Sequence, residues 1–367
     1  MKDIKIVIGG NMGDEGKGLM TDYFSNSPNS IVVCSNGGSQ RGHTVTTPNG
    51  IRHIFHHFGS GTFNKAATYL SEDFILNPII FKKEYDRLGV LGYTPTVYIN
   101  DKCMITTPYD MMANQIIEED RGFQKHGSCG MGIYETIKRY NSGVWDFDRG
   151  LIREYYLDEF RINNVGLTNE WRKLFWDDGI FEHYMEDLKF MEDHFILVKD
   201  DNFLNKFDNI IFEAGQGLLL DQNNKEYYPH LTPSNTGIKN PKRIIENIKW
   251  DDDINIETCY VSRTYLTRHG KGYLPNERNK GVINRYMFDK TNVPNPFQDA
   301  LRYGLLNLKD LYERCSNDVG NFGDEKSIAI THCNEYDWDN DKLIELFKDW
   351  NIYYSDGETH NDVDMVI

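Results

Sequence analysis

A glycine-rich segment near the start of the chain holds the residues most able to do chemistry. Residues 9–18 read G-G-N-M-G-D-E-G-K-G and directly follow a short apolar run, residues 4–8, that predicts a strand. A glycine loop between a strand and a helix is typical of a phosphate-binding cradle, because its N–H groups can point inward at the helix N-terminus. Lys17 is then placed to reach the phosphates. Asp14 and Glu15 repel phosphate, so we interpret them as a magnesium ligand or a base in the chemistry.

This loop differs from the common P-loop pattern. Five residues separate Gly10 from Gly16, where the P-loop has four, and Gly18 stands where a serine or threonine normally holds magnesium. We therefore describe the segment as P-loop-like and expect its magnesium contacts to come from other residues.

A second glycine loop, residues 36–44, follows the next apolar run, residues 31–34. Open α/β sheets bind their ligands outside the carboxyl ends of the strands, so both loops are expected on one edge of a sheet. His43 in the second loop is a candidate proton donor or phosphate contact. A lone histidine is more often structural, and this one gains weight only from the neighbouring first loop.

The elements that must position these loops alternate between strand and helix. Strand candidates are residues 4–8, 31–34, 96–99, 209–212, 256–261 and 327–331. Helical patterns cover residues 17–24, 108–119, 171–192, 239–248, 297–308 and 341–350. The alternation predicts an α/β fold with a mainly parallel central sheet flanked by helices. We expect a single domain over residues 1–367, with a helical subdomain inserted at about residues 140–208, where aromatic and charged side chains are dense.

Composition excludes several classes of protein. The 367 residues carry a formal net charge of −16, which argues against a general nucleic-acid binder. At 39% hydrophobic and 13% aromatic, the chain is too apolar to be disordered. No apolar run approaches the length of a membrane span, and the N-terminus does not resemble a signal peptide. The six scattered cysteines indicate reduced thiols, so we expect a cytoplasmic protein with no membrane or nucleic-acid partner.

The two loops together resemble the adenylosuccinate synthetase family, whose signature is G-D-E-G-K-G followed by G-G-x-x-x-G-H-T. Further segments resemble that family in the same order. They are residues 127–133 (G-S-C-G-M-G-I), 212–221 (F-E-A-G-Q-G-L-L-L-D), 228–236 (Y-P-H-L-T-P-S-N-T) and 267–277 (T-R-H-G-K-G-Y-L-P-N-E). The resemblance extends from residue 5 to about residue 355.

The resemblance implies a two-step carbon–nitrogen ligase. A nucleoside triphosphate phosphorylates the 6-oxygen of a purine mononucleotide, and the amine of L-aspartate then displaces that phosphate at C6. By the same resemblance, Asp14 removes the N1 proton and His43 stabilises the transferring phosphoryl group, so both are the expected catalytic residues. Asp14 and the Gly42 carbonyl are the expected Mg²⁺ ligands.

The implied binding residues fall into three sets. The triphosphate is expected on Gly13, Asp14, Glu15, Gly16, Lys17, Gly18, Gly42, His43, Thr44 and Asn334. The purine nucleotide is expected on Asp14, Asn36, Gln40, Ser128, Cys129, Gln216, Thr232 and His269. Aspartate is expected on Thr291, Asn292 and Arg302.

The chain departs from the cellular pattern of this family at several places. One arginine, Arg302, remains where an arginine-rich loop normally serves aspartate, the ribose 2′-hydroxyl and the triphosphate. Asn334 replaces the acid that selects guanine in the donor, so ATP is the expected donor, with GTP or dATP open. The C-terminal S-x-G-P element is reduced to S-D-G-E at residues 355–358.

These departures resemble the virus-encoded, PurZ-like branch that acts on dGMP, 2-amino-2′-deoxyadenylosuccinate synthase, on the path to 2-aminoadenine phage DNA. The expected reaction converts dGMP, aspartate and ATP to 2-amino-N6-succinyl-dAMP, ADP and phosphate. Asp14 argues against this branch, because many of those viral enzymes have serine at that position. Conversion of IMP to adenylosuccinate in AMP biosynthesis therefore stays as the alternative, and a non-catalytic nucleotide-binding module as a remote one.

Other patterns have plainer interpretations. His53, His56 and His57 have metal-like spacing but are expected to pack around the second loop. Cys129 lacks a partner pattern for a nucleophile. The family resemblance implies a homodimer in which an arginine reaches the neighbouring subunit's nucleotide, and Arg139 and Arg149 are the candidates.

Overall fold

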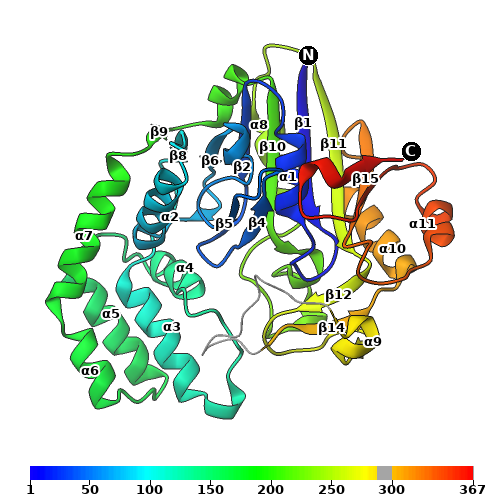
Figure 1. Ribbon diagram of the computed structural model, residues 1–367. Helices are drawn as coiled ribbons and strands as arrows, with labels where there is room; N and C mark the ends of the chain where they lie inside the picture. Colours follow the sequence, from blue (N-terminus) through cyan, green and yellow to red (C-terminus); the bar gives the residue numbers. More distant parts are fainter. Residues whose placement is uncertain (287–299, 367) are drawn as a thin grey trace.

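A ten-stranded central sheet organises the described part of the chain, residues 1–286 and 300–366 of a computed structural model (Figure 1). Its strands, in spatial order, are β17 (Val363–Met365), β16 (Asn351–Ser355), β15 (Glu325–Thr331), β11 (Ile254–Arg263), β1 (Lys2–Gly9), β10 (Asn209–Gly217), β2 (Ser30–Cys34), β6 (Ala67–Leu70), β8 (Val97–Asn100) and β9 (Ile196–Val198). Only β16 and β17 pair antiparallel among these described strands. The predicted mainly parallel sheet is confirmed.

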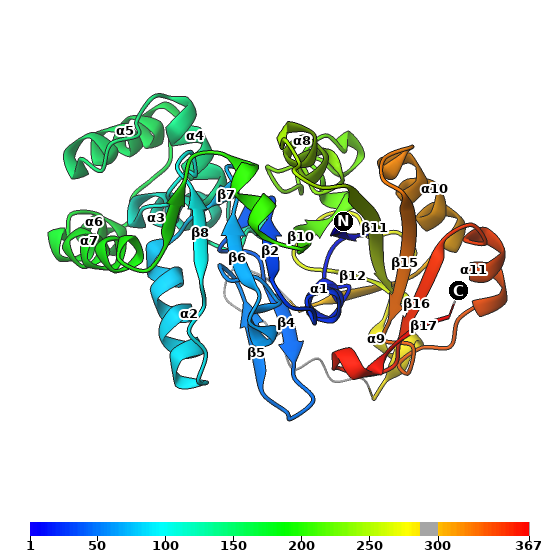
Figure 2. The same ribbon diagram turned by 90° about the horizontal axis from the view of Figure 1, so that it is seen from above.

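Apolar side chains on both faces explain why the inner strands read as continuous hydrophobic runs. In β1, Ile4, Ile6 and Ile8 pack on one face of the sheet with residues of α8 and α10. Val7 points to the opposite face, where it packs with Leu19 and its neighbours in α1. The view from above shows α1 and α8 on opposite sides of the strands (Figure 2).

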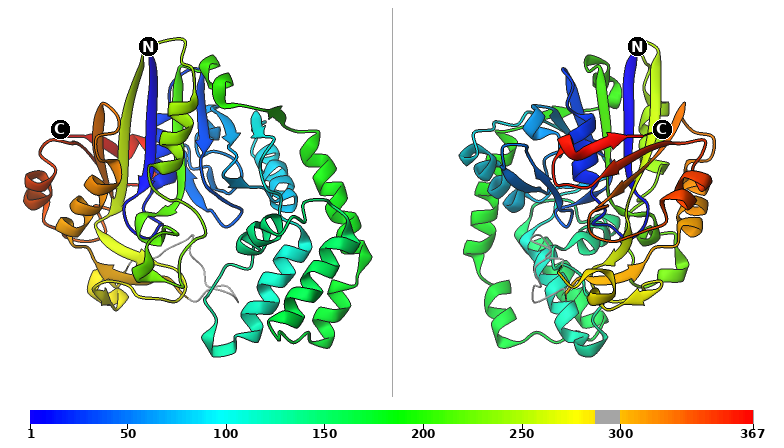
Figure 3. Two further views of the ribbon diagram at one scale, coloured as in Figure 1. Left: turned by 180° about the vertical axis from the view of Figure 1, so that it is seen from behind. Right: turned by 45° about the vertical axis from the view of Figure 1, so that its right-hand side comes forward.

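The helices have clear bounds in the described residues. They are α1 (Lys17–Phe24), α2 (Pro78–Val90), α3 (Pro108–Asp120), α4 (Ile133–Asn141), α5 (Arg149–Ile162), α6 (Asn169–Phe175), α7 (Asp178–Glu192), α8 (Lys239–Asn247), α9 (Lys280–Asn284), α10 (Leu308–Val319) and α11 (Asn340–Leu346). Helices α3 to α7 gather beyond the β9 end of the sheet (Figure 3). Their buried aromatic side chains form a second core with α2. No described helix has the length and apolar character needed to cross a bilayer.

Within the described residues, three small sheets accompany the central one. They are β12 (Tyr265–Arg268) with β14 (Arg302–Leu305) and β13 (Glu277–Arg278), β4 (His43–Thr46) with β5 (Arg52–Phe55), and β3 (Gly37–Gly38) with β7 (Phe74–Ile75). The β4–β5 hairpin begins at His43, near the end of the second glycine loop. A tertiary pairing therefore fixes where that loop ends.

Two predicted helices are wrong in detail. The pattern at residues 297–308 is not a helix where it is described, because β14 pairs there with β12 and α10 starts only at Leu308. Tyr303 of β14 packs against Tyr265 of β12, and this cross-strand contact outweighs the local pattern. The pattern at residues 171–192 forms two helices, because the side chain of Asp177 caps the second by accepting from Gly179 N at 3.0 Å.

Candidate active site

The carboxyl edge of the central sheet opens into a cleft of 1040 Å³. Its wall includes the loop after β1, the end of β10 and the segment after β15, as expected for an open α/β sheet. Most of the predicted site residues line it. They are Gly13, Asp14, Glu15, Gly16, Lys17, Gly18, Gln40, Gly42, His43, Thr44, Ser128, Cys129, Gln216, Thr232, His269 and Asn334.

The other predicted site residues lie elsewhere. Asn36 is buried below the cleft, where its amide donates to Ser234 Oγ at 2.9 Å and accepts from Gly215 N at 2.7 Å. Arg302 lies on β14, where its Nε donates to Glu277 Oε1 at 2.8 Å. Thr291 and Asn292 fall outside the described residues.

The first glycine loop is built around close backbone contacts. A Cβ on Gly9 would lie 2.7 Å from the Gln216 carbonyl oxygen, so β1 can approach β10 here only without a side chain. Gly16 begins α1 at a φ of 90°, which favours glycine. Lys17 and Glu15 are both buried, with Nζ 3.6 Å from Oε2. The loop therefore holds an internal ion pair beside the cleft.

Asp14 is fixed on both its backbone and its side chain. Its φ of 57° is a left-handed conformation that aspartate and asparagine tolerate better than most residues. Its Oδ2 lies 3.0 Å from His269 Nε2, and its carbonyl accepts from Arg263 Nε. Burial alone would raise the pKa of Asp14, but the hydrogen bond and charge of His269 outweigh it, together with Arg263 and Lys17, and lower the pKa to about 2. The carboxylate is thus ionised at neutral pH.

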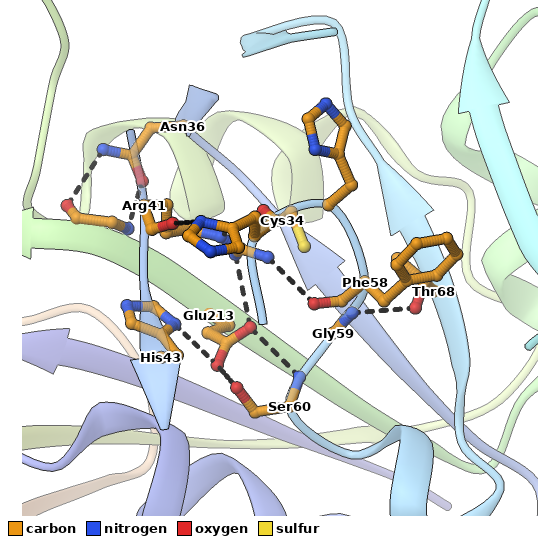
Figure 4. Close-up of polar contacts among 12 residues, drawn as sticks. Cys34, Asn36, Arg41, His43, Phe58, Gly59, Ser60, Thr68 and Glu213 are labelled. Carbon is orange, nitrogen blue, oxygen red and sulfur yellow. Dashed lines mark hydrogen bonds and ion pairs between the residues drawn. The ribbon is translucent and has the colours of Figure 1, made fainter. Parts of the chain in front are cut away.

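His43 is held from below by a buried carboxylate (Figure 4). Its Nδ1 lies 2.8 Å from Oε1 of Glu213 on β10, and Arg41 Nη1 donates to Oε2 of the same carboxylate at 3.2 Å. Burial lowers the pKa of the His43 imidazole. Burial would raise the pKa of Glu213, but His43 and Arg41 outweigh this and lower it. Glu213 is therefore a carboxylate with a cation on one side and a histidine on the other.

Residues 127–133, one of the segments that resemble the family, are held in place by α3. The backbone N–H of Gly127 donates to Glu118 Oε2 at 2.9 Å, and Asn114 Nδ2 donates to Ser128 Oγ at 3.0 Å. Burial raises the pKa of the Cys129 thiol to about 11, so it is not a thiolate nucleophile at neutral pH.

Glu135, at the start of α4 beside this loop, is a buried carboxyl on the cleft wall. Burial raises its pKa to about 7, well above its ordinary value. Because the folded state binds the proton more tightly than the unfolded chain, stability is greatest at low pH and falls as the pH rises toward 7. We expect Glu135→Gln to remove most of this pH-dependent loss of unfolding free energy, which is on the order of 2–3 kcal/mol. Thermal unfolding of the wild type and the variant at pH 5 and pH 8 measures this effect. If the stability difference between the two pH values is the same in both proteins, the prediction is contradicted.

Three residues that sequence reasoning did not single out complete the site. Arg41, Glu213 and Arg263 are buried; Glu213 contacts His43, Arg263 contacts Asp14, and Arg41 contacts Glu213. Arg41 and Glu213 both lie within the motifs described above. Their contact joins residues that are 172 positions apart, so the local sequence did not indicate it. Arg263 ends β11 directly before the 267–277 motif and carried no signal of its own.

The structure corrects one proposed role. Arg139 does not project toward a neighbouring subunit, because its side chain is fully buried and bonds Asp110 Oδ1 at 2.8 Å. Arg149 is partly exposed on α5, and its Nη1 lies 3.1 Å from Asp178 Oδ1. His56 packs on the second loop as expected, with its Nδ1 in contact with the Arg41 carbonyl, whereas His57 Nε2 accepts from the N–H of Asn77, the N-cap of α2.

The expected Mg²⁺ fits the residues present. Within residues 1–286 and 300–366, no three His, Cys, Asp or Glu side chains form a metal-binding group. Mg²⁺ does not need one, because it usually keeps several waters and binds one or two carboxylates together with substrate phosphates. Asp14 offers a partly exposed carboxylate on the cleft wall and Gly42 an exposed backbone, which suits such a site.

Comparison with known proteins identifies the family of this chain. The sequence model of the family described as adenylosuccinate synthetase matches residues 6–292, more than half of the chain.

The chain belongs to the adenylosuccinate synthetase family.

Curated proteins described as adenylosuccinate synthetases are similar in sequence to this chain. The adenylosuccinate synthetase of Microcystis aeruginosa is 31% identical over 304 residues, which cover 78% of this chain and 64% of the relative. That of Lactobacillus helveticus is 30% identical over 285 residues, 74% of this chain and 64% of the relative. The matched part thus spans less than two thirds of either relative's length.

Solved structures of this family share the fold. The fully ligated adenylosuccinate synthetase of Plasmodium falciparum aligns with a TM-score of 0.72 at 17% identity, over 99% of both chains. The succinoaminodeoxyadenylate synthetase (PurZ) of cyanophage S-2L, bound to dGMP and dATP as an energy donor, aligns with a TM-score of 0.68 at 14% identity. That alignment covers 100% of this chain and 95% of the phage protein.

Proposed function

We propose that the protein is a nucleoside-triphosphate-dependent ligase that joins L-aspartate to C6 of a purine mononucleotide. The observation that carries the proposal is the gathering of Asp14, Lys17 and His43 on one cleft at the carboxyl edge of the sheet. These residues supply a base, a phosphate-binding cation and an imidazole to a single volume. Membership of the adenylosuccinate synthetase family supports the same class of reaction.

The chemistry follows from the positions of these groups. Asp14 accepts the N1 proton of the purine, which moves charge to O6, and O6 attacks the γ-phosphorus with release of the nucleoside diphosphate. Lys17 and the loop amides hold the triphosphate, and His43 faces the phosphoryl group as it transfers. The amine of aspartate then attacks C6, and phosphate leaves with the electrons of the C6–O bond. When bound by Asp14 and the Gly42 carbonyl, Mg²⁺ supplies positive charge for the phosphate oxygens.

We further propose dGMP as the nucleotide and ATP as the donor. Arg302, the one arginine in residues 290–303, is bonded to Glu277 and to the Gly272 carbonyl at 2.7 Å. Its guanidinium is thus held by other protein groups and is not itself part of the cleft wall, and this supports a substrate without a 2′-hydroxyl. Asn334 lines the cleft with a neutral amide, which supports an adenine donor.

IMP remains the second candidate nucleotide, because one observation favours it. Asp14 is retained at the cleft wall, whereas many PurZ-like enzymes have serine at this position. The curated relatives of this chain also carry the name adenylosuccinate synthetase.

A substrate panel tests both levels of the proposal. dGMP, GMP, dIMP and IMP are each incubated with aspartate and with ATP, GTP or dATP, and succinylated products are identified by mass spectrometry. We expect phosphate release that requires both aspartate and dGMP. If only IMP gives a succinylated product, the nucleotide substrate is IMP and not dGMP. Nucleotide binding without turnover for any combination would contradict the ligase and leave a binding module.

Asn334 gives a specific prediction about the donor. Asn334→Asp is expected to raise kcat/KM for GTP relative to ATP by roughly 10-fold to 100-fold, because a carboxylate can accept the charge-assisted hydrogen bonds that guanine offers. Steady-state kinetics with the two donors measure the ratio. The KM for the purine mononucleotide serves as the control and should not change. An unaltered donor ratio would show that Asn334 does not contact the donor base.

A further inference from the structure

Glu213 lies in the middle of β10 and is not part of the cleft wall, to which the later residue Gln216 of the same strand contributes. Its side chain is fully buried, so substrate cannot touch it. Any effect on the reaction must therefore pass through a neighbour. The neighbour that does line the cleft is His43, whose Nδ1 is 2.8 Å from Glu213 Oε1.

The carboxylate of Glu213 is itself held rigidly. Ser60 Oγ donates to Oε1, Ser60 N donates to Oε2 at 3.3 Å, and Arg41 Nη1 donates to Oε2 at 3.2 Å (Figure 4). Arg41 is fixed in turn, because its Nε and Nη2 donate to the carbonyls of His56 and Phe58 at 3.1 and 3.2 Å. Glu213, Ser60 and Arg41 are buried, so packing and bonding inside the protein determine the position of the His43 ring.

We propose that Glu213 is a positioning residue for His43, holding the proton on Nδ1 and leaving Nε2 for the phosphoryl group. A carboxylate behind an imidazole selects one tautomer and one ring orientation, and it supports the positive charge that arises when the ring also donates from its other nitrogen. Arg41 balances the charge of Glu213, which makes a buried carboxylate tolerable at this point. The catalytic part of this inference rests on the proposed ligase function, whereas the tautomer does not.

A plain structural role is the competing explanation, and the chain offers a matched control for it. Glu257 on β11 is also a buried carboxylate in the central sheet, bonded to Lys5 Nζ at 2.7 Å and to Tyr353 OH at 3.1 Å. It has no histidine among these partners and lies outside the described cleft wall. Glu257→Gln therefore measures what the loss of a buried charge does to the fold alone.

The kinetic experiment compares Glu213→Gln, Glu257→Gln, His43→Asn and the Glu213→Gln/His43→Asn double variant. We expect Glu213→Gln to lower kcat by roughly 10-fold to 10³-fold, with a much smaller change in KM for either nucleotide. Glu257→Gln should lower stability but leave kcat near the wild-type value. The double variant should be no slower than His43→Asn, because Glu213 has no route to the reaction without the imidazole.

The spectroscopic experiment needs no turnover. ¹⁵N-histidine NMR of the wild-type protein should show His43, assigned by its absence in His43→Asn, protonated at Nδ1. Glu213→Gln should lose this tautomer preference while Glu257→Gln keeps it. If the wild-type chain has no ligase activity, the proposed function fails and the NMR result still decides this inference.

Two outcomes would overturn the proposal. Additive losses of kcat in the double variant would assign Glu213 a structural role only. A wild-type His43 protonated at Nε2 and not at Nδ1 would leave Glu213 with no ring proton to accept, and that measurement remains possible even where Glu213→Gln does not fold.

Discussion

Replacing Asp14 with asparagine is expected to lower kcat by roughly 10²-fold to 10⁴-fold while nucleoside triphosphate binding is largely preserved. The carboxylate is the only part that changes, and it is ionised because His269 and its neighbours hold the pKa at about 2. An amide cannot accept the N1 proton, so the purine 6-oxygen stays a weak nucleophile. Steady-state kinetics measure the loss, and calorimetric titration with the donor measures binding.

Asparagine is the informative replacement because of the backbone. Asp14 has a φ of 57°, which asparagine adopts readily, whereas alanine would add strain and mix a folding effect into the kinetics. A Mg²⁺ titration separates the two roles proposed for the carboxylate. If excess Mg²⁺ restores the activity of the variant, Asp14 acts as a metal ligand and not as the base.

Local sequence was sufficient to place the two loops. Residues 9–18 carry glycines where the backbone turns sharply. Gly16 is the N-cap of α1, and the helix starts at Lys17, as predicted from the sequence. The strand before the loop is apolar on both faces, so β1 could be expected in the middle of a parallel sheet. Because parallel strands end on one edge, the meeting of Asp14 and His43 on one cleft followed from topology.

What the sequence could not supply depends on contacts between distant residues. Glu213 and His43 are both in motifs, but their pairing requires β10 to lie beside β2, with the second loop folded back over it. Arg302 was expected to serve aspartate, yet β14 directs it to Glu277 through a strand pairing that the local pattern did not reveal. Such pairings are decided by tertiary packing and not by local propensity.

Arg139→Met is expected to destabilise the protein by about 3–5 kcal/mol, because it leaves a buried carboxylate without its cation. The guanidinium makes a two-pronged contact with Asp110, Nε to Oδ1 at 2.8 Å and Nη2 to Oδ2 at 2.9 Å. It also donates to the Val144 and Ile105 carbonyls, both at 2.8 Å, and so joins α4 to the segments around it. Denaturant unfolding of the variant measures the loss of free energy.

Two further variants identify the uncompensated charge as the cause. Asp110→Asn added to Arg139→Met should recover part of the stability, since asparagine can still cap α3 but carries no charge to bury. Arg149→Ala is the control, because Arg149 is about one-third exposed and its ion pair with Asp178 is half-exposed, so its loss should change stability by less than about 1 kcal/mol. A double variant as unstable as Arg139→Met would mean that the lost hydrogen bonds and packing matter more than the charge. A large loss in Arg149→Ala would mean that this exposed arginine has contacts beyond Asp178, as an arginine at an interface between subunits would.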